Sequence, residues 1–137
     1  MIGLLLKHSF NEANFASIKK NDDICIFSTV APPEKLDKPF FQTLRVYDFK
    51  ETVVATDITT AMLASTLMLP KKKYFYIRSF EWVGFEPLMY KELEDIYLNE
   101  ELELIVSNES DYHTIKNLFR EPKYIVKNWD FSEIEND

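Results

Sequence analysis

The chain alternates short apolar runs with amphipathic stretches, and this order constrains its fold more than any other feature of its 137 residues. Apolar runs rich in β-branched and aromatic residues are typical of strands buried on both faces, and amphipathic stretches between them are typical of helices that cover a parallel sheet. The runs that fit the strand pattern are residues 2–8, 23–29, 43–49 (the weakest), 52–56, 73–79, 102–108 and 123–128. The stretches that fit the helix pattern are residues 10–20, 58–69, 86–99 and 109–119.

These elements predict an α/β fold, a three-layer Rossmann-like sandwich with a mostly parallel sheet of about six or seven strands. Each predicted helix is long enough to cross over between two parallel strands. The length suits a single domain over residues 1–137. The helix at 58–69 is apolar nearly all round, so we expect it to be the most deeply buried helix, with a second face against another domain or subunit.

Charge and composition exclude several classes of function. Acidic residues outnumber basic ones by 23 to 16, and residues 91–137 hold 13 acidic against 5 basic side chains. Nucleic-acid binding is disfavoured, because its affinity comes largely from Lys and Arg. No apolar stretch approaches the roughly 20 residues of a membrane span. Cys25 lies in an apolar run and is predicted to be a small buried hydrophobe, which fits a reducing, cytoplasmic location, and we expect no secretory signal at residues 1–9.

Polar side chains follow the predicted strands at the edge where ligands bind in open parallel sheets. The predicted substrate-binding residues are His8, Ser9, Asp57, Thr59, Arg78, Glu81, Ser107 and Glu109. Their spacing forms no catalytic motif, so catalytic residues remain unassigned. The sequence lacks the G-x-G-x-x-G, G-x-x-x-x-G-K-[ST] and G-x-S-x-G motifs, and it has too few Cys and His residues for the usual zinc sets, so we predict no cofactor and no metal.

Asp57, Thr59 and Arg78 each have a structural alternative to ligand binding. Asp57 or Thr59 would accept hydrogen bonds from the free amides at the start of the helix at 58–69. The functional alternative is that Asp57 accepts from a sugar hydroxyl, since a carboxylate repels phosphate. Arg78 would hold a phosphate or carboxylate through two parallel hydrogen bonds, or it would pair with Glu81 or Glu86.

The two histidines are weaker candidates. His8 has the ordinary pKa range of a general base, but a lone histidine at a strand end is more often a structural hydrogen-bonding group. His113 falls on the flank of an apolar helical stripe and is predicted to lie at the surface. Asp57 and Glu81 would form an acid and base pair only at a suitable separation of their carboxylates, which the sequence does not specify.

Three segments resemble the amino-terminal domain of GT-B fold glycosyltransferases. TVVATDITTAMLASTLMLPKKKYFYIRSFEW is similar to the strand, helix and next strand beneath the acceptor side of their cleft. ELELIVSNESDYHTIKNLF is similar to their strand that ends in a serine and an acidic residue before a helix. EPKYIVKNWDF is similar to the segment that leads to their donor domain, with Asn128 and Asp130 matching and Trp129 in place of a common glycine.

This resemblance, over residues 52–131, implies a glycosyltransferase-like domain that binds an acceptor or glycan. It also implies that the donor domain, which holds the nucleotide-sugar, is missing, and that the chain is not catalytic alone because half a cleft does not exclude water. A companion chain with a donor domain, or a homo-oligomer, would complete the site. Exposed aromatics such as Trp82 and Trp129 would favour an interface.

Two other readings stay open. The chain is alternatively a non-enzymatic α/β protein-interaction module whose acidic last third docks on a basic protein surface. Such docking would weaken steeply with salt, whereas sugar binding would hardly change. A small α/β hydrolase or transferase with His8 as base ranks last, because no nucleophile is visibly paired with this histidine.

Overall fold

The computed structural model of the chain describes residues 1–6, 15–21, 23–30, 37–78, 80 and 90–135. In this part the strands form one sheet in the order β3-β2-β1-β4-β5-β6-β7, and every neighbouring pair is parallel. The strands are β1 (Ile2–Leu5), β2 (Ile24–Ser28), β3 (Phe40–Gln42), β4 (Thr52–Ala55), β5 (Lys72–Ile77), β6 (Glu103–Val106) and β7 (Tyr124–Ile125). The predicted α/β sandwich with a parallel sheet is therefore confirmed.

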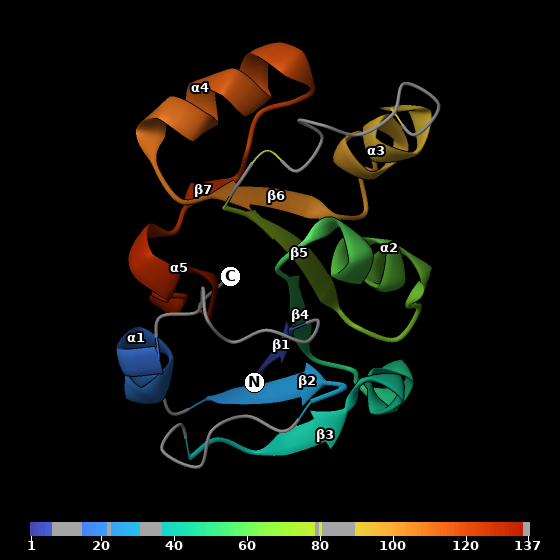
Figure 1. Cartoon of the computed structure of the whole chain (residues 1–137), viewed down its shortest axis with the longest axis vertical. Coiled ribbons are helices and arrows are strands. Elements are labelled where there is room, and N and C mark those ends of the chain that lie inside the picture. The colour runs from blue at the N-terminus through green and yellow to red at the C-terminus, as the bar shows by residue number, and fades with distance from the viewer. Residues whose placement is uncertain (7–14, 22, 31–36, 79, 81–89, 136–137) are drawn as a thin grey trace.

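Helices cover both faces of this sheet. They are α1 (Phe15–Lys20), α2 (Ile58–Thr66), α3 (Tyr90–Tyr97), α4 (Glu109–Leu118) and α5 (Ser132–Glu135), with 3-10 helices η2 (Thr43–Asp48) and η4 (Lys127–Trp129). Figure 1 shows α1 and α5 on one side of the sheet and α2 and α3 on the other. All four predicted helices are present, and the described part of each is shorter than the sequence pattern predicted. None of the helices in the described ranges has the length and apolar character needed to cross a membrane.

Each strand contributes side chains to two separate hydrophobic cores. Successive side chains of a strand point to opposite faces of a sheet. On β5, Phe75 and Ile77 pack in the core beneath α2, α3 and α4, whereas Tyr74 and Tyr76 pack in the core beneath α1, η4 and α5. Because both faces are covered, the strands read as nearly continuous apolar runs.

The prediction of a strand at residues 43–49 is wrong. These residues form η2, and the third strand is the short edge strand β3, which precedes it. Leu44 and Val46 gave the appearance of strand alternation, but only Val46 is buried and Leu44 is exposed. A 3-10 helix has three residues per turn, so residues two apart, such as Leu44 and Val46, point in different directions and only Val46 faces the core.

The helix α2 is buried on one face only, and so it is less buried than predicted. Ile58, Ala61 and Ala64 are buried against the sheet, but Met62 on the outer face keeps 46% of its surface exposed. The apolar outer face explains why the sequence looked apolar all round. The prediction for Cys25 is confirmed, because this side chain is fully buried.

Candidate functional site

The strand order reverses direction between β1 and β4. Strands β2 and β3 are added in turn on one side of β1. Strand β4 lies on the other side of β1, and β5, β6 and β7 follow it in the opposite direction. In open α/β sheets the crevice that binds ligands lies outside the carboxyl ends of the strands at such a reversal. Thr56 and Asp57 follow β4 directly, and Arg78 follows the neighbouring strand β5. The sequence therefore placed Asp57, Thr59 and Arg78 at the edge where a ligand is expected.

Asp57 begins α2 as its N-cap. Its Oδ1 accepts a hydrogen bond from the Thr60 amide at 2.7 Å, and the Thr60 hydroxyl oxygen accepts one from the Asp57 amide at 3.1 Å. This reciprocal pair satisfies two amides at the helix start, so the predicted capping role is confirmed. An ionised carboxylate has about four acceptor positions, and the cap occupies one of them. Thr59 lies exposed in the same first turn.

Thr56 connects the two strands at the reversal. Its buried hydroxyl donates to the carbonyl oxygen of Leu5 at the end of β1, at 2.7 Å, and its amide donates to the Thr60 hydroxyl oxygen at 3.0 Å. Sequence reasoning missed this residue. The available signal was a hydroxyl side chain between a buried strand and a capping residue.

Arg78 is half-buried, and contacts with Thr56 and Trp129 help to hold its guanidinium in place. Its Nη2 donates to the carbonyl oxygen of Thr56 at 3.2 Å. Its guanidinium carbon lies 4.6 Å from the centre of the Trp129 ring, within the range of a cation–π interaction. The alternative partners Glu81 and Glu86 lie outside the described residues.

Trp129 is buried, so the prediction that it is an exposed interface aromatic is wrong. Only 5% of its surface is exposed, and its ring packs edge-on against Tyr76 at 5.3 Å and Phe131 at 6.2 Å. Asn128 and Trp129 both have positive φ angles, of 53° and 64°. This left-handed turn folds the indole back against the sheet.

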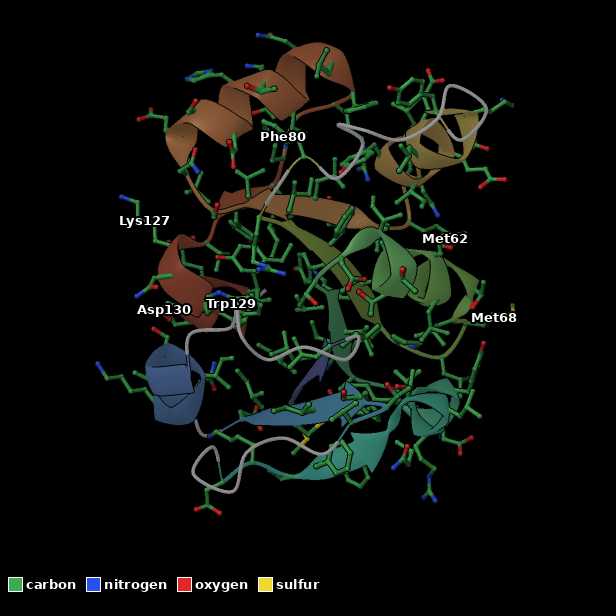
Figure 2. All side chains as sticks on the ribbon, viewed as in Figure 1. Met62, Met68, Phe80, Lys127, Trp129 and Asp130 are labelled. Atoms are coloured by element: carbon green, nitrogen blue, oxygen red, sulfur yellow. The ribbon has the colours of Figure 1, made fainter. Side chains whose placement is uncertain are left out.

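The hydroxyl of Tyr76 holds the same turn in place. It donates to the carbonyl oxygen of Val126 at 2.7 Å and accepts from the Trp129 amide at 3.3 Å. Burial raises the pKa of Tyr76 above its ordinary value, so this phenol stays protonated at neutral pH. Figure 2 shows Lys127 and Asp130 at the left of the view, farther from the centre of the molecule than Trp129.

The remaining predicted residues lie farther from the reversal or outside the described part of the chain. Ser107 and Glu109 follow β6, two strands from β4, and among the described residues no hydrogen bond joins either of them to Asp57. His113 is exposed, as predicted. The predicted residues that lie outside the described part of the chain are His8, Ser9, Glu81 and Trp82.

The site presents a carboxylate, an exposed hydroxyl and a fixed guanidinium at one edge of the sheet. In chemical terms, a carboxylate can accept hydrogen bonds, a guanidinium can donate them, and a hydroxyl can do both. Within the described ranges no cluster of three or more His, Cys, Asp and Glu side chains is arranged to hold a metal ion. Comparisons with protein-family models, curated proteins and solved structures find no match. The function is therefore inferred from the fold and the site.

Proposed function

We propose that this chain is a glycosyltransferase-like domain that binds a sugar or glycan acceptor at the reversal between β1 and β4. The observation that supports it most is the position of Asp57, whose carboxylate lies at the reversal point and uses one oxygen for its cap. A carboxylate only accepts hydrogen bonds, so it suits a sugar hydroxyl, whereas it repels a phosphate.

Arg78 and the fold add support to this proposal. The contacts of Arg78 with Thr56 and Trp129 hold a guanidinium beside the carboxyl end of β4. The doubly wound parallel sheet agrees with the Rossmann-like domain implied by the resemblance over residues 52–131. A single domain of this kind forms one wall of a cleft, so under this proposal the nucleotide-sugar site lies on another domain or on a partner chain, and residues 1–137 alone do not catalyse transfer.

Sugar binding is tested by calorimetric titration of the wild-type chain and Asp57→Asn with glucose, galactose, N-acetylglucosamine and maltotriose. Asparagine keeps an oxygen for the cap and removes the charge, so the helix start stays intact. Because hydrogen bonds to a charged group are roughly twice as strong as neutral ones, we expect Asp57→Asn to weaken binding by about tenfold. Asn108→Asp, the reverse exchange at the start of α4, is the matched control and leaves binding unchanged. Equal affinity in wild type and Asp57→Asn contradicts the proposal.

The partner is tested by affinity capture of the tagged chain from its host, followed by titration of the captured complex with UDP-glucose. We expect a second chain with a nucleotide-sugar domain in a fixed ratio, and we expect UDP-glucose to bind the complex and not the chain alone. Capture of the tagged chain by itself contradicts the requirement for a partner, while the saccharide titration still tests acceptor binding.

A protein-interaction module is the second candidate, and the exposed apolar side chains on α2 and in the segment that follows it favour this function. Met62, Met68 and Leu69 remain 46%, 94% and 49% exposed, and Figure 2 shows both methionines at the side of the molecule away from Trp129. Flexible methionine side chains adapt readily to a partner surface. Under this alternative, Met62→Ser with Met68→Ser abolishes partner capture while saccharides do not bind at Asp57. Capture through the acidic residues 91–137 would instead fall steeply as ionic strength rises.

A further inference from the structure

A pocket lies on the α2 side of the sheet, between η2 and strands β2 and β3. Its volume is about 210 Å³, and neither Asp57 nor Arg78 lines it. Its wall is formed by Met1, Cys25, Phe27, Phe41 and Phe49, with Arg45 and Asp48 of η2 at the exposed mouth. The Met1 ammonium pairs with Asp23 at 3.1 Å. An apolar interior with two opposite charges at its opening restricts the chemistry of any ligand.

The interior of this pocket is aromatic and uncharged. The Phe27 ring meets Phe49 edge-on at 5.2 Å and stacks on Phe41 at 5.6 Å. Gly3 allows this arrangement, because a Cβ there would lie 2.8 Å from ring atoms of both Phe27 and Phe49. Burial raises the pKa of the Cys25 thiol to about 11, so it is neutral at physiological pH. Since an apolar cavity of about 150 Å³ holds benzene, this pocket has room for one ring with a short substituent.

The mouth of the pocket carries a cation and an anion that do not pair with each other. Arg45 and Asp48 are three residues apart in η2, and side chains at that spacing in a 3-10 helix lie on the same side. In the part of the chain that the structure describes, neither side chain forms an ion pair or a hydrogen bond. Both charges therefore remain available to a ligand that carries one group of each sign.

We propose that this pocket binds a small aromatic zwitterion, such as a free amino acid with a single ring. The ring lies among Phe27, Phe41 and Phe49, the carboxylate contacts Arg45, and the ammonium contacts Asp48. This site is independent of sugar binding at Asp57, because the two share no lining residue.

The proposal is tested by calorimetric titration with L-phenylalanine and three probes that each lack one feature. Glycine lacks the ring, phenylacetate lacks the ammonium and phenethylamine lacks the carboxylate. L-phenylalanine binds most tightly, and glycine does not bind. Both charged groups are exposed, so Arg45→Gln weakens the binding of L-phenylalanine and of phenylacetate by only roughly two- to fivefold. It leaves the binding of phenethylamine unchanged. Asp48→Asn weakens the binding of L-phenylalanine and of phenethylamine to a similar extent and leaves the binding of phenylacetate unchanged.

Lys50→Gln is the matched control, because Lys50 is exposed next to Phe49 but does not line the pocket. This variant removes a nearby positive charge and leaves all affinities unchanged. Thermal unfolding of each variant establishes that it is folded. The proposal is overturned if L-phenylalanine does not bind, if glycine binds equally well, or if Arg45→Gln and Asp48→Asn bind L-phenylalanine like the wild type.

Discussion

Two joints on the same edge of the sheet, β4 to α2 and β6 to α4, start their helices in the same way. Each has a hydroxyl residue followed by a capping residue, Thr56 and Asp57 in one, Ser107 and Asn108 in the other. The cap accepts from the amide three residues later in both, at 2.7 Å for Asp57 and 2.8 Å for Asn108. The two joints therefore share the same N-cap hydrogen bond, although only Asp57 forms a reciprocal pair, with Thr60.

Their surroundings differ because the sheet order differs around them. Thr56 is buried and bonds Leu5 across the reversal, and its carbonyl oxygen accepts from Arg78. Ser107 is half-buried, and its hydroxyl oxygen accepts from Asn108 next to it at 3.4 Å. A helix cap is therefore a local property of the sequence, whereas a candidate site depends on which strands the fold places side by side.

The largest expected difference between the joints is in the hydroxyl residues. Thr56→Val keeps the shape of the side chain but leaves the Leu5 carbonyl oxygen buried without this donor, so we expect a loss of about 1–3 kcal/mol in the free energy of unfolding. Ser107→Ala at the second joint changes it by less than about 0.5 kcal/mol. Urea denaturation of both variants measures the difference. Equal losses would show that the reversal adds nothing to the first joint.

Removal of the two capping side chains should give a smaller difference in the free energy of unfolding than the hydroxyl variants do. Asp57→Ala and Asn108→Ala each remove the acceptor for a helix amide, which typically costs about 1 kcal/mol. We expect the larger loss at Asp57, because this cap is part-buried and takes part in a reciprocal pair with Thr60, whereas the Asn108 cap is exposed. Urea denaturation again gives the comparison, and a larger loss at Asn108 would reverse it.

At alkaline pH, ionisation of the tyrosines near the two joints should affect stability differently. Burial raises the pKa of Tyr76 above 10, so above pH 10 the unfolded state releases a proton that the native state keeps. The stability from this group is fully present below pH 10 and is lost as the pH rises through the native pKa. Tyr112 on α4 also has a raised pKa, caused first by its hydrogen bond to Glu121, but this phenol is exposed and should ionise without unfolding.

The measurement is absorbance of ionised tyrosine together with circular dichroism during alkaline titration. Tyr76→Phe removes the steepest loss of structure above pH 10, and Tyr112→Phe removes an ionisation step that precedes unfolding. If Tyr76→Phe unfolds over the same pH range as the wild type, the buried phenol does not control the transition.

The smallest effect on stability is expected from exchanging the caps. Asp57→Asn and Asn108→Asp each keep a good capping residue, so Asp57→Asn should change the free energy of unfolding by less than about 0.5 kcal/mol. Asn108→Asp should lose about 0.5 kcal/mol, because it replaces the exposed hydrogen bond from Asn108 Nδ2 to Asp111 Oδ2, at 3.1 Å, by two neighbouring carboxylates. Thermal unfolding at neutral pH measures this. A large loss of unfolding free energy in Asp57→Asn would mean that the carboxylate charge stabilises the fold. A loss of sugar binding in this variant would then no longer be separable from a loss of stability.

The sequence predicted the features that depend on local patterns. Apolar runs and helical periodicity identified the α/β class, and the short polar stretch after β4 identified Asp57 and Thr59 as the two candidate caps, of which Asp57 is the cap. The contact between Thr56 and Leu5 joins residues 51 positions apart, and the contact between Arg78 and Trp129 joins two distant strand ends. Neither contact can be predicted from residue spacing. The first depends on the strand order, and the second depends on the left-handed turn at Asn128 and Trp129.

The most direct test of sugar binding at the first joint is an amide NMR titration with the same saccharides. The account predicts chemical-shift changes in residues 56–60 and none in residues 107–111, with the changes lost in Asp57→Asn and retained in Asn108→Asp. Changes centred on residues 107–111, or changes at residues 56–60 that persist in Asp57→Asn, would contradict a sugar site built on the Asp57 carboxylate.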